Sequence, residues 1–112
     1  MIRNDRKKLT KKLDTLFSLW IRKRDKHCLK CFRTDTLQCS HISSRKSLAG
    51  RWNDKNAITL CYACHIYWRH KEPVEAAEWL KTNYPEFYNE GIKVRQMTVK
   101  NLDLNTLIEK YK

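Results

Sequence analysis

Apolar residues in the first quarter of the chain recur at helical spacing. Five large ones return every three or four positions, with lysine and arginine at many positions between them. They are Leu9, Leu13, Leu16, Phe17 and Trp20. Such spacing places apolar side chains on one stripe of a helix. The pattern predicts an amphipathic helix from about Asp5 to about Lys26.

Two segments in the middle of the chain favour strands instead. Residues 36–42 and residues 57–60 are rich in residue types that β-strands favour. The stretch between them, 43–55, is polar and rich in Ser, Arg, Lys and Asn. We therefore expect a strand, a loop and a returning strand.

Helical signals return after the second strand. Helices are expected over 62–71 and 73–83, and Pro85 is expected to start one more turn or short helix. Apolar spacing also predicts a helix over 102–111, whereas 92–100 could form a short strand or an arm.

These elements predict a small α+β chain, and 112 residues suit a single domain. We expect a basic amphipathic helix in residues 1–27, a metal-stapled core in 28–71 and a helical C-terminal part in 72–112. A chain of this size buries a modest core, so a metal or disulfide staple often adds stability.

The distribution of charge changes the expected partner. The chain has a net charge of +12 at pH 7. Residues 1–71 hold 18 Lys and Arg against 5 Asp and Glu, whereas residues 72–112 hold 6 against 7. A positive field of this size attracts polyanions, although solubility alone would need only a few net charges. We therefore expect a nucleic-acid partner.

Four of the five cysteines form two C-x-x-C pairs, Cys28 with Cys31 and Cys61 with Cys64. Zn²⁺ prefers four soft donors in a tetrahedron, and two such pairs supply two donors each. Two redox-active pairs or isolated buried cysteines are the alternatives. We favour a structural zinc site, with Cys39 left over as a small buried strand residue rather than a metal ligand.

The two pairs are farther apart than in an ordinary zinc ribbon, which leaves roughly 15–20 residues between them. Here residues 32–60 intervene, and they contain both predicted strands and the basic loop. A zinc ion that holds both ends would clamp this segment against the helix after Cys64.

Three residues of the clamped region suit phosphodiester hydrolysis. His41 ends the first strand, Asn56 precedes the second, and His65 directly follows the second cysteine pair. Hydrolysis needs a base that activates water, a cation that stabilises phosphate charge, and a group that holds the base in the right tautomer. Two histidines and an amide meet these needs, although Asn56 could instead cap a turn.

The order of these motifs resembles the HNH, or ββα-metal, endonucleases. C-x-x-C is followed by a strand ending at His41, then by Asn-Ala-Ile-Thr-Leu at 56–60, then by C-x-x-C-H ending at His65. Within that superfamily, C-S-H-I-S-S-R at 39–45 and R-W-N-D-K-N at 51–56 resemble the phage recombination nucleases typified by lambda NinG, also called Rap. Those nucleases act on branched DNA.

The resemblance covers about residues 16–75 and implies a ββα-metal fold with assigned roles. His41 would activate water, Asn56 would orient His41 through a side-chain hydrogen bond, and His65 would bind a divalent cation. Many HNH enzymes have an acidic metal ligand just before the first histidine, but Ser40 stands there in this chain.

The ligand set of the catalytic cation is therefore open. Asn56, His70 or water could complete it. With more imidazole and fewer carboxylates, the site would favour Mn²⁺, Ni²⁺ or Co²⁺ over Mg²⁺.

The loop between the strands holds the expected DNA contacts. Arg45, Lys46, Arg51 and Lys55 lie beside the presumed site and are expected to bind phosphates. Trp52 lies among them and could either pack under the loop or wedge into DNA. A solvated loop without DNA contacts is the alternative reading of these charges.

These features favour a metal-dependent HNH endonuclease acting on DNA, including branched or recombination-intermediate DNA. The alternative is a non-catalytic zinc-ribbon module that binds nucleic acid. We expect Zn²⁺ as structural cofactor, and Mg²⁺, Mn²⁺ or another divalent cation for catalysis. With no evident signal peptide or membrane-length apolar run, we expect no membrane partner and an intracellular, cytoplasmic location, in the host if the chain is of phage origin. The amphipathic terminal helices could form a homodimer interface.

Overall fold

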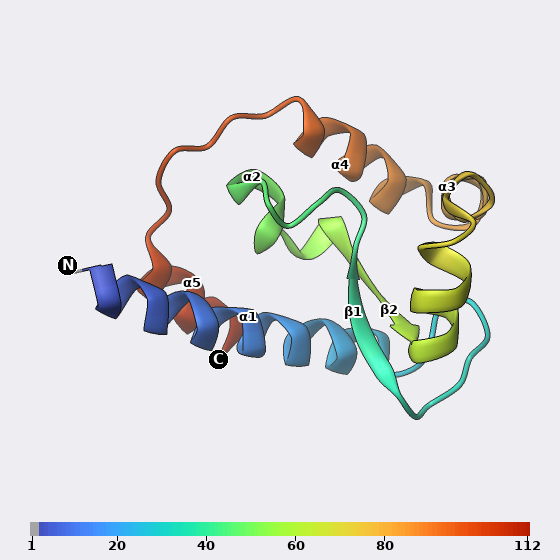
Figure 1. Cartoon of the computed structure of the whole chain (residues 1–112), viewed down its shortest axis with the longest axis horizontal. Coiled ribbons are helices and arrows are strands. Elements are labelled where there is room, and N and C mark those ends of the chain that lie inside the picture. Colours follow the sequence, from blue (N-terminus) through green and yellow to red (C-terminus); the bar gives the residue numbers. More distant parts are fainter. Residues whose placement is uncertain (1–2) are drawn as a thin grey trace.

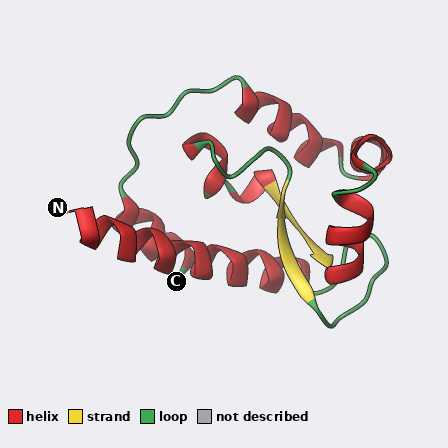
Figure 2. Cartoon of the chain, viewed as in Figure 1, coloured by secondary structure: helices red, strands yellow, loops and turns green. Residues whose placement is uncertain are grey.

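Two antiparallel strands form the centre of the protein, surrounded by helices (Figures 1 and 2). The computed structural model describes residues 3–112. Strand β1 (Leu37–His41) pairs with β2 (Ala57–Cys61), and His41 lies opposite Ala57. The predicted α+β class and the predicted pair of strands are confirmed.

The two strands cross helix α1 (Arg3–Asp25) near its C-terminal end (Figure 1). This helix confirms the predicted amphipathic helix, and the first two residues of the expected basic segment lie outside the described part. Leu13, Phe17 and Ile21 are fully buried on its inner face. The apolar spacing therefore identified the side of the helix that packs on the core.

Polar contacts join the end of α1 to the start of β2. The guanidinium of Arg24 donates to the carbonyls of Asp54 and Ala57 at 2.6 and 2.8 Å. The carboxylate of Asp25 accepts the backbone N–H of Thr59 at 2.8 Å. These directional bonds determine where α1 lies along the strand, which apolar packing alone does not.

Helix α5 (Leu104–Tyr111) packs beside α1 and confirms the predicted C-terminal helix. The carboxylate of Asp103 caps it by accepting the backbone N–H of Thr106 at 3.3 Å. The hydroxyl of Tyr111 donates to the carbonyl of Trp52 at 2.6 Å. The C-terminal helix thus supports both α1 and the segment between the strands.

Three more helical elements follow β2. They are the π-helix η2 (Ala63–Arg69), α3 (Pro73–Asn83) and α4 (Pro85–Arg95). The chain then crosses to α5 through residues 96–103 without regular structure, so the expected alternative of a short strand in 92–100 is wrong. Pro85 starts a helix of 11 residues rather than a single turn. None of the described helices is long and apolar enough to cross a membrane.

The loop expected over 43–55 is partly helical. It contains α2 (Leu48–Arg51) and leads into the short 3-10 helix η1 (Asp54–Asn56). The side chain of Asn53 caps η1 by accepting the backbone N–H of Lys55 at 3.0 Å. Short polar side chains that bond nearby backbone groups explain why a polar stretch is ordered here.

Strand β2 lies between two apolar clusters. All five of its residues are buried, and successive side chains point to opposite faces. Ala57 packs in the cluster formed by α1 and α5, whereas Ile58 and Leu60 pack in the cluster that includes Leu80 of α3. Burial on both faces explains why this strand is an unbroken run of uncharged residues.

Candidate functional site

The four paired cysteines converge on one point. The sulfur atoms of Cys28, Cys31, Cys61 and Cys64 lie within 4.8 Å of one another, and those of Cys31 and Cys61 are 3.6 Å apart. Four sulfurs placed tetrahedrally at about 2.3 Å from Zn²⁺ would be about 3.8 Å apart. The cluster is therefore compatible with a structural metal such as zinc.

Backbone N–H groups prepare the first pair for a metal. The N–H of Cys31 donates to Sγ of Cys28 at 3.5 Å, and the N–H of Leu29 bonds the carbonyl of Thr59 in β2 at 3.0 Å. Burial raises the pKa of the Cys28 thiol, but backbone donors, that of Cys31 foremost, outweigh it and bring this pKa to about 7. A thiol with such a pKa readily supplies the thiolate that a metal binds.

Cys39 lies outside this cluster. It is partly buried against the apolar cluster of α1 and α5, and burial raises the pKa of its thiol to about 12. The thiol is therefore protonated at neutral pH, and Cys39 serves here as a small packing residue.

Three histidines line one cleft of about 350 Å³ between α1, β1 and η2. His41 comes from the end of β1, His65 from η2, and His70 from the residue after η2. The other lining residues are Asp14, Phe17, Ser18, Cys39 and Arg45. The fold thus brings together the histidines that the sequence singled out.

The ring of His41 is held in one tautomer. Its Nε2 lies 2.8 Å from the carbonyl oxygen of Arg51, and since a carbonyl only accepts, Nε2 must donate. Nδ1 is then the unprotonated nitrogen, which can accept a proton. Phe17 stacks on the ring with the two centroids 5.6 Å apart, and this contact restrains the plane of the imidazole.

The surroundings of His41 also keep it neutral. Burial lowers its pKa most, and the positive charge of Arg45 lowers it further. The hydrogen bond to the Arg51 carbonyl and the negative charge of Asp14 raise it, but the net shift is downward from 6.5. At neutral pH the imidazole is therefore free to act as a base.

His65 is held in the complementary tautomer. Its Nδ1 lies 2.8 Å from Oε1 of Gln38, and since this oxygen only accepts, Nδ1 must donate. Nε2 then keeps a lone pair for a metal. Burial lowers the pKa of His65 to about 4, and the nearby groups of His70 and Arg69 add to the shift.

The π-helical turn of η2 places His70 beside His65. The N–H of His70 donates to the carbonyl of His65, five residues earlier, at 3.2 Å. In an α-helix, side chains five residues apart would point about 140° apart, whereas a π turn brings them onto one side. The ring centroids are consequently 4.6 Å apart, so two imidazoles from one element lie together in the cleft.

Asn56 does not contact His41, contrary to the predicted hydrogen bond. Its buried side chain accepts the N–H of Ser43 at 2.9 Å and donates to the carbonyls of Ser43 and Gly50, both at 3.0 Å. The group that orients His41 is the carbonyl of Arg51 instead. Asn56 holds the loop that carries this carbonyl, since short amide side chains bond nearby turns.

Asn56→Ala is expected to lower the free energy of unfolding by about 2–4 kcal/mol, because three buried hydrogen bonds are lost at once. Urea unfolding measures this loss. Asn89→Ala, at an exposed position of α4, is the matched control and should change stability little. Equal effects of the two substitutions would show that the buried amide is not what holds the loop.

Two of the five predicted DNA-binding residues are engaged within the protein. The indole of Trp52 is 4% exposed, and its Nε1 donates to the carboxylate of Asp14 at 3.0 Å. Arg51 donates to the same carboxylate at 3.0 and 2.6 Å. Of the two alternatives for Trp52, the structure supports packing under the loop, so its assignment to the DNA-binding residues is wrong.

The other three, Arg45, Lys46 and Lys55, have exposed side chains. Of these, Arg45 also lines the histidine cleft. Their charges are therefore placed where a phosphate could reach them, whereas that of Arg51 is largely compensated by Asp14.

Three residues that the sequence did not single out support the cleft. Gln38 sets the tautomer of His65, and Arg69 donates to the carbonyls of His41 and Ile42 at 3.3 and 3.0 Å. Asp14 joins α1 to the loop. The sequence contained one indication of a role for Asp14, because it is the only acidic residue among residues 6–24. Nothing near Gln38 or Arg69 in the sequence indicates their roles, because their hydrogen-bond partners are distant in sequence.

No protein-family model, no curated protein and no solved structure matches this chain. The side chains of this chain themselves carry its possible chemistry. They comprise a four-sulfur cluster and a cleft in which imidazoles of two tautomers meet.

Proposed function

We propose that this protein is a divalent-metal-dependent endonuclease of the HNH type that hydrolyses phosphodiester bonds in DNA. One observation carries the proposal, the presence of two imidazole tautomers in one cleft. His41 offers Nδ1 as a base, while His65 and His70 offer nitrogens to a cation. A base and a cation are the two needs of metal-assisted hydrolysis.

In this proposal Nδ1 of His41 takes a proton from the water that attacks phosphorus, and the bond from phosphorus to the leaving oxygen of the DNA breaks as the new phosphorus–oxygen bond forms. The proton on Nε2 is already donated to the Arg51 carbonyl, which stabilises the imidazolium that forms. The carboxylate of Asp14 lines the same cleft and favours that positive charge. The imidazole is therefore neutral before the reaction, and the Arg51 carbonyl and Asp14 stabilise its positive charge after it takes the proton.

His65 and His70 would hold the divalent cation, which when bound neutralises charge on the phosphate. The donor set fits a nitrogen-preferring ion, because Nε2 of His65 has no competing proton. Asp14 is the one acidic residue in the described lining of the cleft, and its carboxylate already accepts hydrogen bonds from Arg51 and Trp52. Such a set favours Mn²⁺, Ni²⁺ or Co²⁺ over Mg²⁺.

The element order and the charge support the HNH assignment and a DNA substrate. Two antiparallel strands are followed directly by the helix η2, which is the order that the ββα-metal fold requires. The net charge of +12 and the position of Arg45 in the cleft suit a phosphate backbone. Branched or recombination-intermediate DNA is the substrate class that the motif resemblance favours.

Cleavage of supercoiled plasmid and of branched DNA tests the proposal, with Mg²⁺, Mn²⁺ or Ni²⁺ added and with no added metal. Nicked and linear products are expected with a divalent cation, and most with Mn²⁺ or Ni²⁺. A His41→Ala preparation made in parallel controls for contaminating nucleases.

One observation favours the second candidate, a zinc-ribbon module that binds nucleic acid without cutting it. Ser40, at the position of the usual acidic ligand, is buried and does not line the cleft. Absence of cleavage in every metal, by protein that holds zinc and binds DNA, would favour this module.

The cleavage rate is expected to rise with pH through a midpoint below 6.5 and to be constant above it. The base acts when neutral, and burial and Arg45 lower the pKa of His41, while Asp14 opposes them. Arg45→Gln should therefore move the midpoint upward. Lys46→Gln, which removes an exposed charge outside the cleft, should not. An unchanged midpoint in Arg45→Gln, seen in single-turnover pH profiles, would refute this account of the shift.

A further inference from the structure

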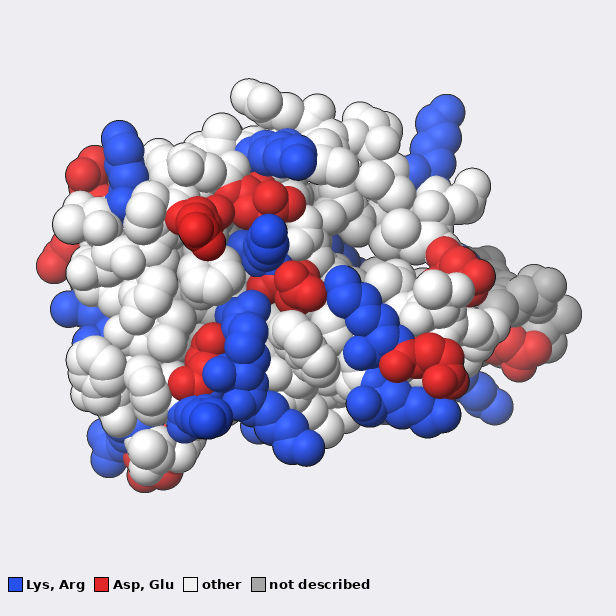
Figure 3. Space-filling model, turned by 180° about the vertical axis from the view of Figure 1, so that it is seen from behind, with Lys and Arg blue, Asp and Glu red and all other residues white. Residues whose placement is uncertain are grey.

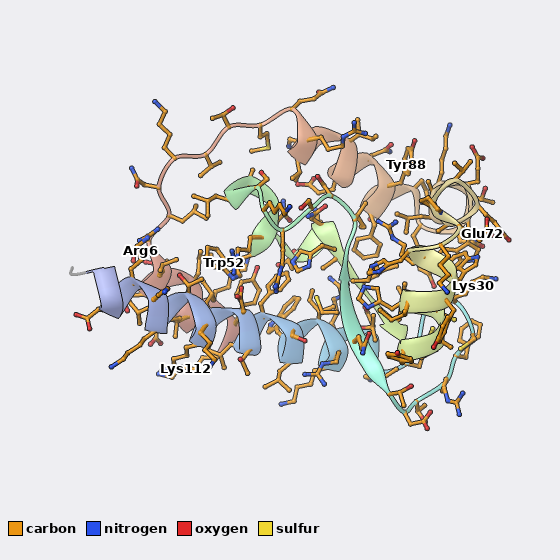
Figure 4. The ribbon with its side chains drawn as sticks, viewed as in Figure 1. Arg6, Lys30, Trp52, Glu72, Tyr88 and Lys112 are labelled. Atoms are coloured by element: carbon orange, nitrogen blue, oxygen red, sulfur yellow. The ribbon has the colours of Figure 1, made fainter. Side chains whose placement is uncertain are left out.

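A basic groove along α1 begins where the histidine cleft ends. This α1 groove has a volume of about 600 Å³. Its charged lining residues are Arg6, Lys7, Lys8, Lys11, Arg51 and Asp14. Asp14 lines the histidine cleft as well, so the two hollows meet at this residue. Figure 4 shows Arg6 and Trp52 on the same side of α1, the side that faces α2.

Helical periodicity aligns the two hollows. Lys7, Lys11, Asp14 and Ser18 are separated by three or four positions, so they lie along one side of α1. Ser18 lines the cleft, whereas Lys7 and Lys11 line the groove. At 1.5 Å per residue, the groove continues for about 10 Å along the helix from Asp14 to Lys7.

The charge and length of the α1 groove suit a phosphate backbone. Five cations and one acid line it. On the back of the molecule, by contrast, blue cations and red acids are interspersed (Figure 3). One nucleic-acid strand has a phosphate every 3.4 Å of axis, so about 10 Å corresponds to about three phosphates.

We propose that the α1 groove binds about three consecutive phosphates on one side of the scissile phosphate, which makes the DNA footprint one-sided. This inference rests on the proposed function, because it takes the histidine cleft as the point of cleavage. Arg45 is the one lysine or arginine in the cleft's lining among residues 3–112. DNA must therefore extend beyond the cut on the groove side, and it can end close to the cut on the other side.

Binding without cleavage tests the groove by itself. Lys7→Gln/Lys11→Gln removes two groove cations, and Lys12→Gln/Lys23→Gln removes two cations that are also exposed but lie on the far side of the same helix. Log affinity falls with log salt concentration, and each phosphate contact contributes about 0.9 to the size of this slope. With no divalent cation added, the first variant loses two contacts, so its slope should be smaller by about two. The second variant should match the parent protein. Equal slopes in the two variants would overturn the groove proposal.

Cleavage near DNA ends tests the one-sided footprint. In duplexes labelled at either end, about three phosphodiester bonds next to one end of each strand should resist cleavage. The bonds next to the other end of the same strand should be cut. Lys7→Gln/Lys11→Gln should weaken this asymmetry. Protection that is equal at both ends would overturn the proposal. If no metal supports cleavage but the two double variants still differ in salt slope, the groove stands and the nuclease function fails.

Discussion

His41→Ala is expected to lower the rate of DNA cleavage by roughly 10²- to 10⁴-fold, the usual contribution of a general base. DNA affinity should stay unchanged, because one neutral imidazole adds little to the field of 24 lysines and arginines. Cleavage rates and equilibrium binding on the same DNA separate these two effects. Loss of the fold would lower both together.

Two further histidine variants sharpen this experiment. His27→Ala is the matched control, because its half-buried ring bonds the Cys28 carbonyl outside the cleft. His65→Ala should also lose cleavage, because it removes a proposed ligand of the divalent cation and so weakens cation binding. A higher concentration of the cation should therefore partly restore cleavage by this variant. The cation should not restore His41→Ala. Full cleavage by His41→Ala in every metal would contradict the assigned base and favour the binding module.

Removal of the metal from the cysteine cluster is expected to unfold the protein. The binding free energy of structural zinc is about 10–16 kcal/mol at neutral pH, which is comparable to the whole stability of a typical domain, about 5–15 kcal/mol. Cys61→Ser should therefore prevent folding or lower the melting temperature strongly. Circular dichroism melting and metal analysis check this, and we expect one zinc per chain in the parent protein.

Cys39→Ala is the control for the zinc experiment, because its sulfur lies outside the cluster. This variant should keep one zinc per chain and lose little stability. A purified parent protein that contains no zinc, and that melts at the same temperature with and without a chelator, would rule out a structural role for the metal.

Local patterns predicted most of the secondary structure. The spacing of Leu13 and Phe17 identified the buried face of α1, on which Ile21 also lies, because a helix repeats every 3.6 residues. The proline at 73 and the apolar spacing before Tyr111 likewise marked helices that the structure contains. Such signals depend on neighbours within a few residues, so they can be interpreted without the fold.

Side-chain partners were harder to predict, because many lie far away in sequence. Asn56 bonds groups 13 residues away rather than His41, and Trp52 bonds Asp14, which is 38 residues away. A polar loop sequence does not indicate which of its residues face inward. The burial of Trp52 follows from the packing of α1 and α5 against the loop, which no local pattern describes.

The sequence by itself determined the strands, most of the helices, and which cysteines and histidines could act together. Each of these depends on residue type and short spacing. Only the tertiary structure decided the geometry of the histidine cleft. The Arg51 carbonyl and Gln38 select the tautomers of His41 and His65, and the π turn places His70 beside His65. A tautomer depends on the partner that the fold places within hydrogen-bonding distance, and a sequence does not encode that distance locally.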